Sequence, residues 1–346
     1  MSRFRALMFL AALPLLAGDW NPRLAAEYLD GRQEKWLSWP NAKQPDGTYC
    51  VSCHTSIPYL LARPSLRRVL GESAPTVHEN KHFENLRAHV AAYDAKAGDT
   101  KTGTSVDAVL GTTLLALKNE GAAFSDELKA SFERMWSLQI REGKQAGAWK
   151  WFNLELDPWE MPESPFYGAS LAALAVGAAP AEYRARPEIR ERVAALLAYL
   201  HEQSPGQTLH NRLVLAWAST KLPDVMSAAA RKAILDELWG KQQPDGGWTS
   251  ASLGPFKPHA TAPPATSGDS YATAFASFIA VRSGVSRKDP RLIKALDWLK
   301  SHQDKQSGFW PAGSMNKQFE ADSMQIRFMQ EAATGYASAA LLEAAN

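Results

Sequence analysis

The feature that most constrains the fold is a short element that recurs along the chain, in which a glutamine is followed closely by a glycine and a tryptophan. The clearest copy is Gln242-Gln243-Pro244-Asp245-Gly246-Gly247-Trp248. Further copies lie at 303–310, at 139–149, at 203–207 without the tryptophan, and at 44–49, directly before Cys50. Recurrence of one element along a chain indicates a stack or ring of similar structural units.

The segments between these copies have the pattern of amphipathic helices. Leu292, Leu296 and Leu299 keep i, i+4, i+7 spacing, and a fuller apolar stripe runs through 189–200. A second set of helices is expected after the turns, at 107–118, 166–176, 209–219, 271–282 and 333–345. No segment shows sustained alternation of apolar and polar residues, so the chain is predicted to be nearly all α.

A helix, a Gln-Gly-Trp turn and a second helix, repeated about five times, resemble the α/α-toroid of squalene–hopene cyclases and protein prenyltransferases. The resemblance covers roughly residues 100–346 and rests on the QxxDGGW element and on 267–274. It implies that Trp248 and Trp310 stabilise turns. The N-terminal Cys-Val-Ser-Cys-His-Thr adds a similarity to bacterial periplasmic proteins with a cyclase-like toroid. The matching segments are 151–154, 158–160, 167–169 and 328–334.

Cys50-Val51-Ser52-Cys53-His54 has the spacing of a c-type haem attachment site. Each cysteine can form a thioether with one haem vinyl group, and the adjacent histidine can then bind the iron as its proximal ligand. Cys50 and Cys53 are the only cysteines of the chain, which excludes a four-thiolate zinc site. The motif therefore predicts one covalent haem c, with His54 as metal ligand; a Cys50–Cys53 disulfide is the main alternative.

Residues 1–18 have the layout of a secretory signal peptide. Arg3 and Arg5 precede an apolar run over 6–17 that is too short to span a membrane as a stable helix. Leu15 stands where a small residue is preferred before a cleavage site, so an uncleaved anchor is an alternative. No later segment is apolar enough to cross a bilayer. Because bacteria attach haem c outside the cytoplasm, we expect a periplasmic protein.

The charge balance bears on the partners. The formal net charge is +2, with 38 basic and 36 acidic side chains. Nucleic-acid binding asks for a basic face, which such a balance does not favour. We expect a redox partner protein or a small apolar molecule instead. The sequence leaves the oligomeric state open.

The resemblance to cyclases does not extend to their acid chemistry. The DxDD cluster that protonates squalene in that family is absent, and only Asp269 stands at the equivalent-looking place. An Asp before an apolar helix is also an ordinary N-cap. The acidic magnesium motifs of ionisation-type terpene synthases are missing, and both cysteines lie far from any prenyltransferase-like zinc set. Squalene-type cyclisation is therefore not expected.

The aromatic segment 149–167 is the candidate wall of a working cavity, and Glu160 lies within it. Its alternative interpretation is a loop held down by its tryptophans, with solvated carboxylates. Glu331, near the start of the last expected helix, can serve a site or merely favour the helix dipole. Glu160, Asp269 and Glu331 are the candidate catalytic residues.

The sixth ligand of the iron would decide the chemistry. A second His or Met gives an electron carrier, whereas an open position permits binding or activation of a small molecule. The candidates are His78, His82, His89, Met161, Met315, Met324 and Met329. The sequence does not choose among them.

We thus expect an all-α, α/α-toroid fold with an N-terminal haem-binding extension: signal peptide 1–18, haem-attachment segment 19–100 and toroid 101–346. The segment after Cys53 is too short to enclose a haem, so the toroid should form part of the pocket. The predicted function is electron transfer or haem-dependent redox chemistry on a small apolar molecule. The alternatives are a terpenoid cyclase- or isomerase-like enzyme and an isoprenoid- or hopanoid-binding module.

Overall fold

The computed structural model describes residues 20–92, 102–261 and 267–345, so the expected signal peptide lies outside the described residues. Within these ranges the regular structure is helical, apart from two isolated bridges, Lys43–Tyr49 and Leu156–Glu160. The prediction of an all-α chain is confirmed.

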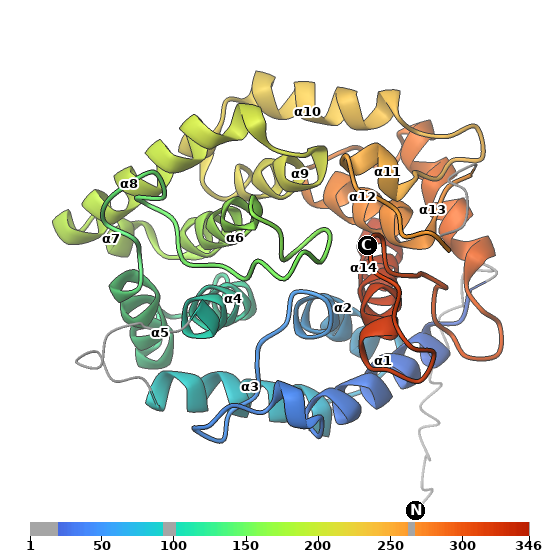
Figure 1. The fold of residues 1–346 in the computed structure, drawn as a ribbon, viewed down its shortest axis with the longest axis horizontal. Coiled ribbons are helices and arrows are strands. Elements are labelled where there is room, and N and C mark those ends of the chain that lie inside the picture. The colour runs from blue at the N-terminus through green and yellow to red at the C-terminus, as the bar shows by residue number, and fades with distance from the viewer. Residues whose placement is uncertain (1–19, 93–101, 262–266, 346) are drawn as a thin grey trace, which may run out of the picture.

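Helices of the described residues form two concentric rings (Figure 1). The inner ring consists of α2 (Ser56–Val69), α4 (Thr102–Lys118), α6 (Ser164–Ala178), α9 (Leu209–Ala218), α12 (Ser270–Arg282) and α14 (Phe328–Ala345). Each inner helix contacts the next along the chain, and α14 contacts α2, which closes the ring. Every residue of α14 from Phe328 to Leu342 is buried, as expected for a helix that is apolar on all sides.

The outer ring surrounds these helices and carries the amphipathic members. It consists of α1 (Pro22–Trp36), α3 (Val77–Ala91), α5 (Asp126–Ser137), α8 (Pro187–Gln203), α10 (Ala228–Gly240) and α13 (Pro290–His302). Two short helices, α7 (Ala181–Arg184) and α11 (Ser250–Leu253), lie in connections. Each outer helix thus leads into an inner helix, and the architecture is that expected of an α/α-toroid.

The segment expected to be a separate haem-bearing extension, 19–100, contributes α1, α2 and α3 to these rings. Helix α2 packs between α14 and α4, and α1 packs against both α2 and α14. The expected division near residue 100 therefore does not coincide with a break in the packing, because the ring would stay open without α2.

Three of the Gln-Gly-Trp turns fasten an outer helix to the next outer helix. Trp149, Trp248 and Trp310 are fully buried. Their indole Nε1 groups donate hydrogen bonds to backbone carbonyls of the preceding outer helix, at Met135 (2.7 Å), Leu238 (2.8 Å) and Leu299 (2.8 Å). This geometry agrees with the structural role expected of Trp248 and Trp310.

The glutamines of the same turns reach the next outer helix. Gln242 Nε2 donates to the carbonyl of Arg291 in α13 at 2.9 Å, and Gln139 Nε2 donates to that of Arg192 in α8 at 3.1 Å. Gln303 Nε2 donates to the carbonyl of Asn21, the residue before α1, at 2.9 Å. The last turn therefore joins α13 to α1 and closes the outer ring.

All the turns lie on one face of the toroid. The connections 37–55, 138–163, 241–269 and 303–327 each run from an outer helix to the start of an inner helix. This face therefore carries the long connections and the N-terminal ends of the inner helices, whose free N–H groups favour negative charge.

The inner helices α14 and α2 approach each other closely, and this contact predicts the effect of one substitution. A Cβ on Gly335 would lie 2.6 Å from Cβ of Pro58. Gly335→Ala should therefore lower the free energy of unfolding by about 1–3 kcal/mol, as overpacking does. Urea unfolding measures the change.

The matched control for that substitution is Gly31→Ala in α1, because nothing lies within 4 Å of the added Cβ. This change should raise the free energy of unfolding by about 0.5–1 kcal/mol. Equal effects of the two substitutions would contradict the close packing of α14 on α2.

Candidate functional site

A cavity of about 320 Å³ opens on the face where the inner helices begin, and we call it the CxxCH cavity. Its wall includes the whole segment Cys50–His54. Aromatic side chains from distant parts of the chain complete the wall: Trp36, Trp39, Phe152, Phe319 and Phe328. The connections before α2, α6 and α14 therefore build one cavity around the motif, as expected if the toroid forms part of the pocket.

Both thiols of the motif line this cavity. Cys53 is buried and Cys50 is half-buried, and both are free cysteines in this structure. Burial, followed by the nearby carboxylates of Asp107 and Glu160, raises the pKa of each thiol well above its usual range. Two protonated thiols therefore face an aromatic cavity next to His54.

His54 is held in one orientation by aromatic contacts. Its ring stacks on Phe328 with centroids 3.6 Å apart and planes 16° apart, and it meets the edge of Trp36 at 5.3 Å. Burial lowers the pKa of His54 to about 3, because the charged imidazolium would lose its hydration. The imidazole is therefore neutral at physiological pH, as a metal ligand must be.

A chain of hydrogen bonds fixes the tautomer of His54. Its Nδ1 lies 2.8 Å from Oγ1 of Thr55, and the Thr55 hydroxyl donates to the Glu331 carboxylate. Because the Thr55 proton is directed to Glu331, the Thr55 oxygen accepts the Nδ1–H of His54, which leaves the lone pair on Nε2. Glu331 in turn accepts from Nε of Arg32 at 2.5 Å.

These residues fit a haem iron. Metal-binding histidines commonly donate their second ring N–H to an oxygen acceptor that orients the ring. Among the described residues, Nε2 of His54 has no hydrogen-bond partner, and His54 lines the cavity that also contains both thiols. The donor set is thus complete for thioether attachment and one axial ligand.

Glu331, a candidate catalytic residue, does not face the cavity but lies one hydrogen bond behind the motif. Its side chain is buried in α14, and burial raises its pKa to about 7 despite the nearby guanidinium of Arg32. It therefore acts on His54 through Thr55.

Glu160 lies in the cavity wall itself. Burial raises its pKa to about 7, and Lys317 on the same wall opposes this shift. A carboxyl group with such a pKa exchanges protons readily near neutral pH. The structure therefore brings two of the three candidate carboxylates, Glu160 and Glu331, to the motif.

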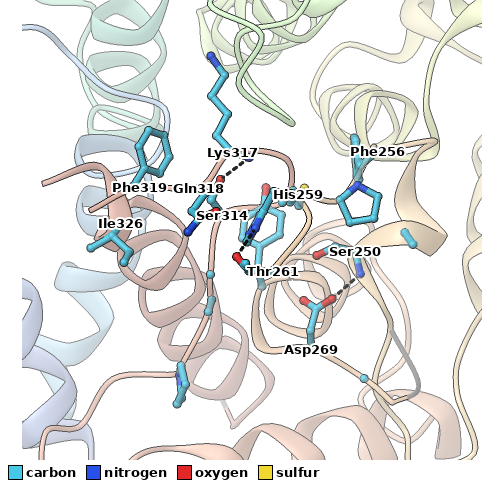
Figure 2. Close-up of a pocket in the computed structure, with 18 of the residues that line it drawn as sticks. Ser250, Phe256, His259, Thr261, Asp269, Ser314, Lys317, Gln318, Phe319 and Ile326 are labelled. Atoms are coloured by element: carbon cyan, nitrogen blue, oxygen red, sulfur yellow. Dashed lines mark hydrogen bonds between the residues drawn. The ribbon is translucent and has the colours of Figure 1, made fainter. Parts of the chain in front are cut away.

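Asp269 lies elsewhere, as the N-cap of α12. Its carboxylate accepts from the backbone N–H of Ala272 at 2.9 Å and from that of Ser250. It lines a neighbouring cavity of about 700 Å³ (Figure 2). Its oxygens are thus occupied by backbone donors, in keeping with the N-cap interpretation.

That neighbouring cavity adjoins the CxxCH cavity, because Lys317 and Phe319 belong to the walls of both. Figure 2 shows these two residues on the connection before α14, with Phe256 on the other side. Tyr271 and Met315 also line it. Lys317 and Phe319 would therefore separate a molecule held there from the CxxCH cavity.

Asp107, which the sequence analysis treated only as the start of a helix, anchors the motif. This buried residue of α4 accepts from the backbone N–H of Val51 at 2.7 Å and from Nε2 of Gln44 at 2.5 Å. The sequence held one signal for this contact. The turn of Gln44 ends in Tyr49 instead of tryptophan, and Gln44 bonds an inner helix where the glutamines of the other turns bond an outer helix.

The candidate sixth ligands lie outside the CxxCH cavity. Nε2 of His82 lies 2.7 Å from Oε1 of Gln33, and Nε2 of His89 lies 2.8 Å from the carbonyl of Tyr49. Of the described residues in the cavity wall, His54 is the only histidine and none is a methionine. Met315 lines the neighbouring cavity, and the remaining candidates, His78, Met161, Met324 and Met329, line neither.

Two features are absent from the described ranges. No group of three or more His, Cys, Asp or Glu side chains is arranged to hold a metal ion. No helix in these ranges has the length and apolar character needed to cross a membrane.

Comparison with known proteins supports the fold. No protein-family model matches the chain, and no curated protein matches it. Its fold is similar to that of a solved structure titled as a polysaccharide lyase, with a TM-score of 0.52 and 13% sequence identity. The similarity covers 93% of this chain and 96% of that one. The structural similarity is in keeping with an α/α-toroid. At so low a sequence identity it concerns the fold alone and carries no conclusion about activity.

Buried neutral histidines predict how stability depends on pH. Burial lowers the pKa of His82 to about 3 from a model-compound value of 6.5. Below pH 6.5 the unfolded chain takes up a proton that the folded chain refuses, so the free energy of unfolding falls by up to about 1.4 kcal/mol per pH unit. His82→Gln should make this fall less steep between pH 6.5 and 4 in urea titrations.

The control is His201→Gln, at an exposed position of α8. This variant also loses one histidine, but from the surface, so its slope is the reference for that of His82→Gln. A slope in His82→Gln equal to that of the unsubstituted protein would contradict the burial of a neutral His82.

Proposed function

We propose that the chain is a monohaem c-type protein, with the haem joined by thioethers to Cys50 and Cys53 and its iron bound by Nε2 of His54. The observation that carries the proposal is the orientation of His54. Its Nδ1–H is engaged by Thr55, which is backed by Glu331 and Arg32, and its Nε2 is free in a cavity that contains both thiols. A neutral histidine fixed in this way is the arrangement that second-shell contacts give to metal ligands.

The proposed localisation is the bacterial periplasm, to which the signal peptide at 1–18 would direct the chain. Bacteria attach haem c after export, so a CxxCH motif that binds haem requires a signal for export. The two sequence features therefore support each other.

The bound haem would supply one-electron redox chemistry and, where its sixth position is open, a site for a small molecule. The absence of a second His or Met from the described cavity wall favours the open position. In the wall of the cavity, Glu160 can hold or release a proton at its carboxyl group near neutral pH.

The substrate side of the proposal rests on the neighbouring cavity. Its volume of about 700 Å³ and its apolar residues, among them Phe256, Tyr271 and Met315, suit a small apolar molecule. Electron transfer to a partner protein remains the second role of the same haem. The rim favours it, since Leu154 beside the cavity is 56% exposed.

The decisive experiment is periplasmic expression together with haem-maturation machinery. We expect haem that stays attached in denaturant and ferrous protein that binds carbon monoxide. The Cys50→Ala/Cys53→Ala variant should lose all covalent haem, whereas Ser52→Ala should retain it. Chain that folds and carries no haem would overturn the proposal, and haem that does not bind carbon monoxide would restrict it to electron transfer.

The hydrogen-bond chain behind His54 predicts a shift of the reduction potential. Thr55→Val removes the acceptor of the Nδ1–H bond and the link to Glu331. The imidazole then becomes a weaker electron donor to the iron, so the potential should rise. Spectroelectrochemical titration of the holoprotein measures it.

The control is Thr113→Val, because the Thr113 hydroxyl bonds only within the inner ring, to the carbonyls of Val109 and Leu171. This variant should keep the original potential. A Thr55→Val potential equal to or lower than the original would show that Thr55 does not act through His54.

A further inference from the structure

The centre of the toroid contains a histidine and a tyrosine that the proposed haem chemistry does not use. His210 of α9 and Tyr271 of α12 are both fully buried, and Nε2 of His210 lies 2.9 Å from the Tyr271 hydroxyl. Burial lowers the pKa of His210 to about 4, so the imidazole is neutral. A buried phenol needs some hydrogen-bond partner, but a neutral imidazole is the partner that can also take its proton.

The neighbours of His210 determine which nitrogen carries its proton. Nδ1 lies 3.2 Å from Oδ1 of Asn211, and Nδ2 of Asn211 donates to Oε1 of Gln207 at 3.0 Å. With the amide N–H group of Asn211 directed to Gln207, its oxygen accepts Nδ1–H of His210. The lone pair of Nε2 then faces the Tyr271 hydroxyl, which donates to it.

An aromatic side chain connects this pair to the candidate haem ligand. The rings of His54 and Trp159 have centroids 5.7 Å apart, and those of Trp159 and Tyr271 are 5.5 Å apart in an edge-to-face contact at 89°. Trp159 is fully buried. Indole and phenol are the side chains that most readily lose one electron, so the path from His54 to Tyr271 consists of oxidisable rings in contact.

We propose, building on the proposed haem function, that Tyr271 is an internal electron donor to the haem and that His210 accepts its proton. In the step, Tyr271 would give up one electron by way of Trp159 to a haem held at His54, and its O–H proton would move to Nε2 of His210. The oxidant is a hydroperoxide. It would take up two electrons and two solvent protons as its O–O bond breaks to give water and an alcohol, or two waters from hydrogen peroxide. Tyr271 would supply one of these electrons and the haem the other.

This step gives the protein a second oxidising site beside the neighbouring cavity, because Tyr271 lines that cavity. A small apolar molecule held there would lie against the side chain of Tyr271 and would not need to reach the haem. The substrate class would be molecules that lose one electron or one hydrogen atom, such as phenols and quinols.

The experiment mixes the ferric holoprotein with hydrogen peroxide and freezes it for electron paramagnetic resonance. The original protein and Tyr199→Phe, a control at a buried tyrosine of outer helix α8, should show the same tyrosyl radical. Tyr271→Phe should lose that signal, and Trp159→Phe should slow its appearance. An unchanged signal in Tyr271→Phe, or the absence of any radical although covalent haem is present, would overturn the inference.

Failure of the haem proposal is separable from failure of this one, because the first shows as missing covalent haem before any peroxide is added. A second measurement does not need peroxide. Nitrogen NMR of histidine-labelled protein, with His210 assigned from His210→Gln, should show Nδ1 protonated and Nε2 bare. Protonated Nε2 would make Tyr271 the acceptor and would also overturn the inference.

Discussion

The structure depends on closure of a ring whose inner helices are buried on all sides. Such helices cannot be left exposed at an end, so the first and last of them must pack on one another. The contact of α14 with α2 meets this requirement, and Gly335 allows it by letting the two backbones approach at Pro58. Gln303 closes the outer ring in the same region through Asn21. The candidate site lies at this closure, because the motif precedes α2 and Glu331 belongs to α14.

Most of the helical ring could be predicted because its signals are local. Apolar periodicity and the Gln-Gly-Trp turns lie within short stretches of sequence, and the positions of Trp248 and Trp310 followed from them. The sequence analysis did not assign α2 to the inner ring. The turn before α2 ends in Tyr49 instead of tryptophan, so the repeat departs from its pattern just before Cys50. The capping role of Asp269 was foreseen as one of two interpretations, since a cap depends on neighbouring residues alone.

The candidate site was predictable in the residues of its motif but not in the side chains that support them. Cys50, Cys53 and His54 form a continuous motif, whereas Thr55 and Glu331 are 276 residues apart in sequence. Such a contact depends on how the ring closes, so no short stretch of sequence indicates it. The same reason hid Asp107, which bonds Val51 and Gln44 from another inner helix, and the contact of Tyr271 with His210. Polar groups buried in the ring are thus explained by tertiary partners that only the closed fold provides.

Burial of the motif has a consequence for the order of biosynthesis. Cys53 is only 4% exposed, and it belongs to the connection that leads into α2. A maturation enzyme needs access to both thiols and room to present the porphyrin edge, which the closed toroid does not offer. On the proposed function, haem attachment therefore precedes completion of the fold, and the porphyrin becomes the nucleus around which the first and last helices assemble. Chains that miss the cofactor would then leave the CxxCH cavity empty beside the closure of α14 on α2.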